Sequence, residues 1–154
     1  MTCLIFQKRS ERRHNKPGQY ITVISNQHWN GNYIDVDGGI YVDGDIHMNG
    51  NHINGTGVIL ATGDVHLNGN TLYAVAGDEI CIYSQGDIQI NGNNIKIVGI
   101  LYAPDGEIRF SGNDITVEGR VIGNTVRFSG NNISIQGNDA ALTSVAISGC
   151  RLVE

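Results

Sequence analysis

The 154-residue chain has little proline and no long apolar run. Only two prolines occur against 21 glycines, while 40% of the residues are apolar and alternate with polar ones. This composition excludes an intrinsically disordered protein and predicts one turn-rich domain with a continuous core. No apolar run reaches the length that crosses a bilayer. The N-terminal sequence MTCLIFQKRSERRH places four apolar residues before a basic cluster, which is the wrong order for a secretory signal peptide.

Motifs of the common catalytic classes are also missing. The sequence has no glycine-rich phosphate loop, no HExxH pair of histidines, and no Ser/His/acid set that its spacing would bring together. We therefore expect no enzyme, no catalytic residue, no cofactor, no resident metal and no specific nucleic-acid partner. The three cysteines cannot all pair within the chain. Cys81 lies in an alternating run and is expected to be a buried hydrophobe, whereas Cys3 and Cys150 are either free thiols or a bridge between copies.

What the chain does have is a repeat. GDIQINGNNIKI, GEIRFSGNDITV and NTVRFSGNNISI, which span residues 86–97, 106–117 and 124–135, each place an Asn/Ser-Gly-Asn turn between two alternating runs. Extending the frame in both directions gives successive turn-glycine spacings of 19, 19, 23, 20, 18 and 19 residues. A fixed period near 20 residues is typical of a stacked solenoid. The sequence predicts an all-β parallel β-helix, right-handed, with about seven coils of three short strands each.

Stacking also assigns roles to the turn residues. Glycine tolerates positive φ at the middle of each turn, and the asparagine that follows it would lie one coil spacing, ~4.8 Å, above its equivalent. Amides at that spacing can hydrogen-bond along the stack, so we expect a structural asparagine ladder. The predicted turn and ladder residues are Gly31, Asn32, Gly50, Asn51, Gly69, Asn70, Gly92, Asn93, Gly112, Asn113, Gly130, Asn131 and Gly149.

Two further columns carry groups that could support chemistry. Asp45, Asp64, Asp87 and Glu107 open successive strands, and stacked like charges must be solvated, hydrogen-bonded to turn amides or bridged by a cation such as calcium. The Gly-Gly-x-Gly-x-Asp nonapeptide of calcium-binding β-rolls is absent. His47 and His66 would stack outward on adjacent coils, but two ligands do not complete a metal site, and a solvated surface is the favoured interpretation.

The N-terminal segment differs in charge from the rest of the chain. Residues 1–16 hold five basic residues and one acidic residue, a net +4, and the remainder carries −9, which together give the overall −5. We expect residues 1–18 to be a basic leader and residues 19–154 to be the solenoid domain. The leader is either a flexible tail or a contact with a membrane surface, nucleic acid or the acidic body of a neighbouring copy.

The sequence LYAPDGEIRFSGNDITVEGRVIGNTVRFSGNNISI, residues 101–135, resembles the Tyr-Ala-Pro-x-Gly and Ser-Gly-Asn-Asn-Ile repeats of bacterial β-helix modules in cell-surface and pilus-associated proteins. In plan, a short solenoid with a basic N-terminal tail is also similar to the bactofilins, which polymerise end to end without nucleotide, although their repeats lack the Ser-Gly-Asn turn. Both resemblances imply a scaffold or surface structure without catalytic residues. They favour an extracellular or cell-surface location slightly over the cytoplasm.

These observations lead to a structural interpretation of function. A solenoid that ends without a cap exposes a strand edge on which another copy can pair. We expect a non-enzymatic protein that assembles with itself head to tail into a filament or surface scaffold, with residues 1–34 of one copy meeting residues 137–154 of the next. The expected inter-subunit residues are Cys3, Cys150, Arg12, Arg13, Trp29 and Leu152.

Two alternatives stay open at this point. One is a module that binds a glycan or cell-wall polymer, which an exposed strip formed by Tyr41, Tyr73, Tyr83 and Tyr102 would favour, because aromatic faces suit sugar rings. The other is a fragment of a larger surface protein.

Overall fold

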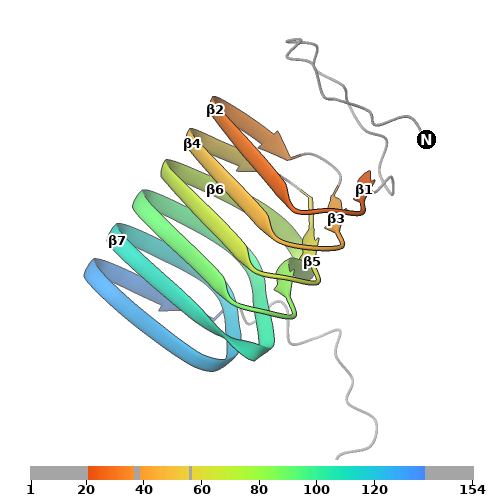
Figure 1. The fold of residues 1–154 in the computed structure, drawn as a ribbon. Helices are drawn as coiled ribbons and strands as arrows, with labels where there is room; N and C mark the ends of the chain where they lie inside the picture. Colours follow the sequence, from red (N-terminus) through yellow and green to blue (C-terminus); the bar gives the residue numbers. More distant parts are fainter. Residues whose placement is uncertain (1–20, 37–38, 56, 138–154) are drawn as a thin grey trace, which may run out of the picture.

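The computed structural model describes residues 21–36, 39–55 and 57–137. These residues are all-β and form a parallel β-solenoid, with the chain winding repeatedly around one axis (Figure 1). The described ranges contain no helix, so none of them supplies a helix that could cross a membrane. The predicted fold class, a parallel β-helix, is confirmed.

Seven strands form one sheet, in which β6 lies between β5 and β4 and also pairs with β7. Every pairing is parallel, as expected when each strand meets its equivalent from the next turn. The strands are β1 (Ile21–Val23), β2 (Gln27–Val36), β3 (Ile40–Val42), β4 (Ile46–Gly55), β5 (Ile59–Ala61), β6 (Val65–Ser84) and β7 (Ile88–Gln136).

The turn glycines set the register. Equivalent glycines pair in succession through β2, β4, β6 and β7: Gly31, Gly50, Gly69 and Gly92. Their pairing aligns the chain over three successive windings of the solenoid. Gly112 and Gly130 continue this line, because a Cβ on either would collide with the carbonyl oxygen of the glycine one repeat earlier. The predicted glycine column therefore reflects close packing of one coil on the next.

The division of each coil differs from the prediction of three short strands. In the first coils one three-residue strand alternates with one ten-residue strand, and the Asn-Gly-Asn turn lies inside the longer one. The turn interrupts the strand pairing only at its last residue, because Asn30 and Gly31 pair with Asn49 and Gly50 and the pairing resumes at Tyr33 with His52. Seven coils are not supported, since the seventh turn at Gly149 lies outside the described residues.

Positive φ is found at the turn glycine in the later repeats, as predicted: Gly92, Gly112 and Gly130 have φ of +152°, +141° and +154°. The asparagine that enters the left-handed region is Asn94, at +53°, two residues after the glycine. Asp114 and Asn132 take the same place in the next repeats, both at +56°. Asn and Asp are the residue types that adopt this region most readily after glycine, so the second residue after the glycine bends the corner.

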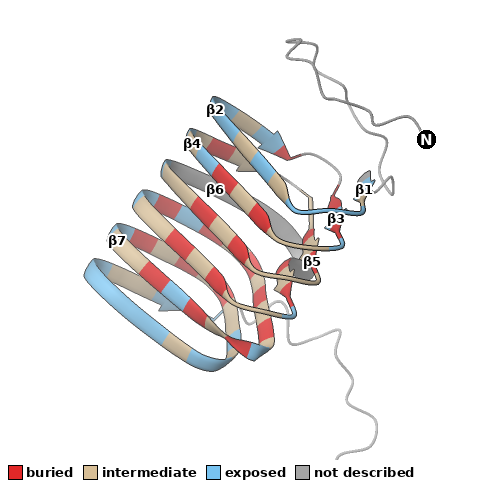
Figure 2. Ribbon diagram, in the orientation of Figure 1, coloured by how far each residue is buried: buried red, intermediate tan, exposed pale blue. Residues whose placement is uncertain are grey.

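The core follows the predicted alternation along the interior of the winding (Figure 2). The paired positions before each turn are buried in four repeats: Ile46 and Met48, Val65 and Leu67, Ile88 and Ile90, and Ile108 and Phe110. After the turn, Ile53, Ile95, Ile97, Ile115 and Val117 are buried as well. Every buried side-chain nitrogen or oxygen among the described residues has a hydrogen-bond partner.

The last described coil departs from this pattern. Phe128 is 47% exposed, although it lies against Phe110, which is completely buried, with ring centroids 5.3 Å apart. Ile135 is also exposed, whereas Val126 and Ile133 are half-buried against the core. The last described coil is mostly exposed (Figure 2), and its exposed residues include the apolar Phe128 and Ile135.

At the opposite end, one aromatic side chain covers the core and a second does not. Trp29 is half-buried and packs against the core. Tyr33 is 73% exposed and stacks on His52 with ring centroids 4.8 Å apart. The strand alternation explains this, because Tyr33 precedes the inward-facing Ile34.

Candidate functional site

The Asn-Gly-Asn corner carries two columns of asparagine side chains. In the column after the glycine, Asn51 Nδ2 donates to Asn32 Oδ1 at 3.1 Å, and Asn70 donates to Asn51 at 3.1 Å. A second run of the same column joins Asn113 to Asn93 at 2.9 Å and Asn131 to Asn113 at 3.1 Å, so that the described bonds form two runs, one on each side of the step from Asn70 to Asn93. In each bond the later coil donates to the earlier one.

A second asparagine ladder precedes the glycine and was not predicted. Asn49 Nδ2 donates to Asn30 Oδ1 at 3.0 Å, Asn68 to Asn49 at 2.8 Å, and Asn91 to Asn68 at 2.7 Å. The signal was present in the sequence, because these repeats read Asn-Gly-Asn and parallel register aligns the first asparagine as well as the second. Ser111 and Ser129 take this position in later repeats.

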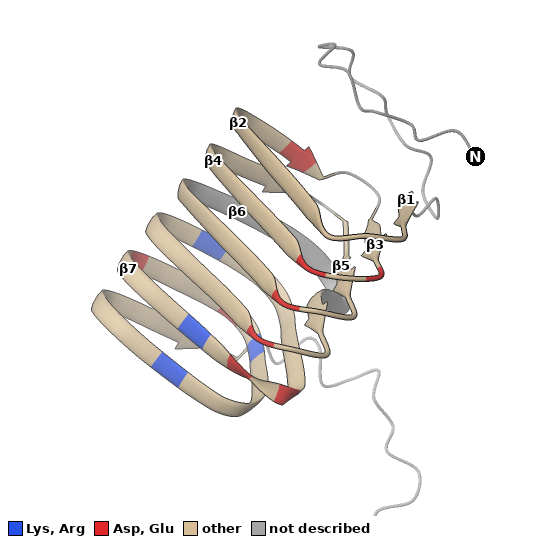
Figure 3. Ribbon diagram, in the orientation of Figure 1, with Lys and Arg blue, Asp and Glu red and all other residues tan. Residues whose placement is uncertain are grey.

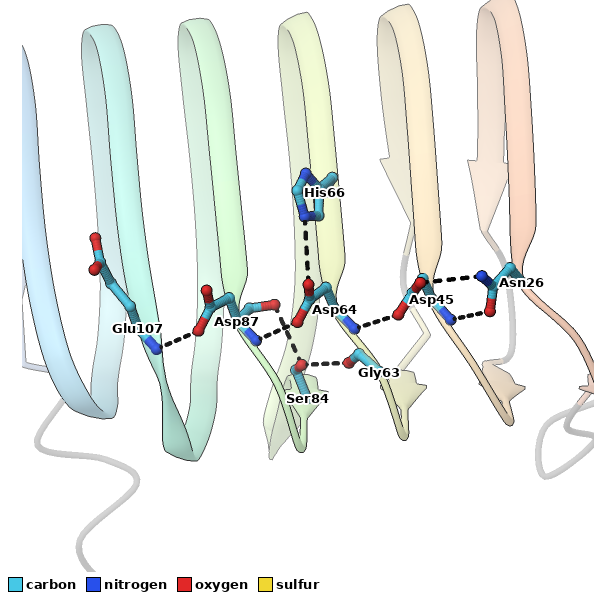
Figure 4. A network of polar contacts seen from close by, with 8 residues as sticks. All are labelled: Asn26, Asp45, Gly63, Asp64, His66, Ser84, Asp87 and Glu107. Atoms are coloured by element: carbon cyan, nitrogen blue, oxygen red, sulfur yellow. Dashed lines mark hydrogen bonds and ion pairs between the residues drawn. The ribbon is translucent and has the colours of Figure 1, made fainter.

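The acidic column forms a ladder of its own (Figure 4). The backbone N–H of Asp64 donates to Asp45 Oδ1 at 2.9 Å, that of Asp87 to Asp64 Oδ1 at 2.8 Å, and that of Glu107 to Asp87 Oδ1 at 2.7 Å. Of the three arrangements left open by the sequence, hydrogen bonding to turn amides is the one found. These bonds join consecutive coils, so the carboxylates are part of the scaffold.

The two ends of the acidic ladder differ from its middle in their residues and contacts. Asn26 takes the carboxylate's place in the first coil, where Oδ1 accepts from the N–H of Asp45 at 2.9 Å and Nδ2 donates to Asp45 Oδ2 at 3.0 Å. At the other end Glu107 lies between two cations, 3.7 Å from Arg109 Nε and 3.4 Å from Arg127 Nε. Figure 3 shows the acidic residues following one line of bends. The described residues contain no group of three His, Cys, Asp or Glu side chains suited to a metal ion.

The histidines stack along an outward-facing column. His47 lies between His28, with ring centroids 4.6 Å apart, and His66, at 4.5 Å. Burial is the main cause that lowers the pKa of His47, the neighbouring His66 and His28 lower it further, and Asp45 and Asp64 act in the opposite direction. Because the rings lie face to face, their nitrogens do not converge on a common point, and the column is not arranged as a metal site.

The four tyrosines do not form one strip. Tyr41 pairs with Leu60, Leu60 with Tyr83, and Tyr83 with Tyr102, so three tyrosines share a column that Leu60 interrupts. Tyr83 and Tyr102 are tilted, with ring centroids 5.8 Å apart. Tyr73 belongs to a different line, where it pairs with Asn54 and Lys96.

Most of the expected inter-subunit residues lie outside the described residues. They are Cys3, Arg12, Arg13, Cys150 and Leu152, together with the basic leader and Gly149. The side chain of Cys81 is likewise outside the description. Trp29 is therefore the one expected contact residue that the structure places, at the N-terminal end of the core.

Comparison with known proteins identifies the chain at the level of a family. No curated protein and no solved structure gives a significant match to the chain. The family model described as "Domain of unknown function (DUF7305)" matches residues 15–144, which include every described strand. The chain therefore belongs to the DUF7305 family.

Proposed function

We propose that the protein is a non-catalytic structural element that assembles head to tail with further copies of itself. The observation that carries this proposal is the apolar end of the described winding. Phe128 and Ile135 are exposed at positions whose equivalents one repeat earlier, Phe110 and Val117, are completely buried. A solenoid end that exposes core side chains and a strand edge favours pairing with a further coil.

The two ends are chemically complementary. Trp29 begins the inward column that continues through Met48, Leu67 and Ile90, so its ring offers apolar surface at the head. In the described bonds of the ladder after the glycine, the later coil donates, which leaves Asn32 Nδ2 as a donor at the first described coil and Asn131 Oδ1 as an acceptor at the last described coil. Stacking one copy on another in the same direction would continue this pattern, whereas reversing one copy would oppose donors to donors.

The finer features of the winding belong to the same proposal. A right-handed winding is favoured because crossover connections between parallel strands are right-handed in about 98% of cases. A seventh coil with its turn at Gly149 would cover Phe128 and Ile135 and move the open end to that coil, so that the joint would form between residues 1–34 of one copy and 137–154 of the next. Cys3 or Cys150 would strengthen that joint under oxidising conditions.

Electron microscopy and light scattering of the full-length protein, with and without reductant, test this proposal. We expect filaments whose length grows with protein concentration, and we expect Trp29→Arg to shorten them. Tyr33→Arg is the matched control, because Tyr33 lies on the same coil but is exposed and faces away from the core. Uniform monomers of the unmodified protein at high concentration would refute head-to-tail assembly.

A second candidate function is carbohydrate binding. The column shared by Tyr41, Tyr83 and Tyr102 favours it, because exposed aromatic faces stack on sugar rings. The column is interrupted by Leu60, and head-to-tail assembly is therefore the function that the described residues support best.

A further inference from the structure

An open groove follows the corner of the solenoid where the chain passes through its Asn-Gly-Asn turns. Its volume is about 720 Å³, and only asparagine and glycine residues line it. The two asparagine ladders form its walls and the glycines between them form its floor. The lining residues in the first wall are Asn30, Asn49, Asn68 and Asn91; those in the second are Asn32, Asn51 and Asn70; and the floor is Gly31, Gly50, Gly69 and Gly92.

The walls are held in place by the ladders themselves. Asn68, for example, donates to Asn49 at 2.8 Å and accepts from Asn91 at 2.7 Å, and Asn51 is bonded in the same way to Asn32 and Asn70. A primary amide has two N–H donors and two acceptor lone pairs. Each ladder bond uses one donor and one lone pair, so every amide keeps one of each for a ligand. A ligand would meet these groups already ordered, which lowers the entropy lost on binding.

Three of the four floor glycines, Gly50, Gly69 and Gly92, have no room for a side chain, whereas a Cβ at Gly31 would make only an ordinary contact. A Cβ added at Gly50 would come within 2.8 Å of the carbonyl oxygen of Gly31, and one at Gly69 within 2.7 Å of that of Gly50. The groove therefore keeps a backbone floor at these coils, on which a ring-shaped group can lie between the two walls. Its length follows the solenoid axis, with a pair of amides on each of three coils, ~4.8 Å apart.

The lining identifies the ligand class. The groove has no charged side chain among its described lining residues, so charge attraction cannot select an ionic polymer there. Repeating donors and acceptors on two parallel walls suit a neutral, extended chain that carries hydroxyl groups on both edges. We propose that the asparagine groove binds a neutral β-1,4-linked glycan, with successive sugar rings on successive coils. This proposal rests on carbohydrate binding, the second candidate function, and names the site at which the carbohydrate would bind. It does not depend on head-to-tail assembly.

The tyrosine column is a separate place on the molecule. Tyr83 and Tyr102 lie on the line of short strands that begins with β3 and β5, whereas the groove lies within β2, β4 and their continuations. A glycan held by aromatic stacking would depend on Tyr102, and a glycan held by the amide walls would depend on Asn51 and Asn68. Substitutions can therefore distinguish the two sites.

Cellohexaose, a neutral β-1,4-linked glucan, is the probe, and isothermal titration calorimetry of the full-length protein is the measurement. We expect the double variant Asn51→Ser, Asn68→Ser to weaken binding at least about tenfold. Asn113→Ser is the matched control, because Asn113 also gives and receives a ladder bond but lies outside the groove. We expect this control and Tyr102→Ala to bind as the unmodified protein does. Thermal unfolding of each variant shows whether it is folded at the assay temperature.

Three outcomes would overturn the proposal. Absence of cellohexaose binding by the unmodified protein would remove both the site and the carbohydrate-binding candidate, while filament formation would still decide the assembly proposal separately. Binding lost in Tyr102→Ala but retained in the asparagine double variant would move the site to the tyrosine column. Tighter binding of polygalacturonate than of cellohexaose would refute selection of a neutral ligand.

Discussion

Replacing Asp64 with alanine should lower the free energy of unfolding, because the backbone N–H of Asp87 would lose its acceptor. The bond is 2.8 Å long and partly buried. A hydrogen bond to a charged group contributes about 1.5–3 kcal/mol. The Asp64 side chain is 46% exposed, so water can partly replace it, and we expect a loss of about 1–2 kcal/mol. In a chain of this length such a loss lowers the melting temperature by about 2–8 °C.

Asp64→Asn is the matched control. Its Oδ1 can still accept from the N–H of Asp87, as Asn26 Oδ1 already accepts from the N–H of Asp45 at 2.9 Å. The substitution also removes the contact between Asp64 and His66, but that pair is 4.0 Å apart and partly exposed, so it contributes little. We expect a change of less than about 0.5 kcal/mol.

Thermal and urea unfolding followed by circular dichroism measure both variants. The reasoning requires the alanine variant to be clearly less stable than the asparagine variant. If Asp64→Ala has the same melting temperature as the unmodified protein, the hydrogen bond from the N–H of Asp87 to Asp64 contributes nothing to stability. If Asp64→Asn is as unstable as Asp64→Ala, the charge of the carboxylate contributes more to stability than its role as a hydrogen-bond acceptor. The backbone N–H hydrogen bonds would then not be what stabilises the acidic ladder.

Two further predictions concern the core and pH. Phe110→Ala should lower the free energy of unfolding, measured in urea, by about 3–5 kcal/mol, because it leaves a cavity in a fully buried site. Phe128→Ala removes an exposed ring of the same stack and should lower it by less than half as much. Equal losses in the two variants would contradict the buried column. Because the pKa of His47 is lowered in the fold from its ordinary value of 6.5, the unfolded chain binds more protons as the pH falls through that value. The melting temperature should therefore fall as the pH drops from about 8 to about 5, and His47→Gln should reduce this slope, whereas an unchanged slope would exclude His47 as a cause.

Repeat spacing and residue alternation were enough to predict the winding and its interior. The interval between turn glycines can be read directly from the amino-acid sequence. Parallel stacking follows from it, because each strand pairs with the equivalent strand of the next coil. The alternation at Ile46 and Met48, or at Ile88 and Ile90, likewise fixes which side chains face inward, since strand residues alternate between faces. The asparagine ladder after the glycine could be anticipated from the same spacing.

The detailed contacts between neighbouring coils could be known only from the folded chain. The 23-residue interval between Gly69 and Gly92 did not reveal where its extra residues lie, and the pairing places the irregularities between Val75 and Ile82. The partners of the acidic column, the stacking of His28 with His47 and the separation of Tyr73 from the other tyrosines depend on the lateral offset between coils. Repeat spacing fixes which residues are equivalent, but the chain path around each corner fixes which of their atoms come within bonding distance.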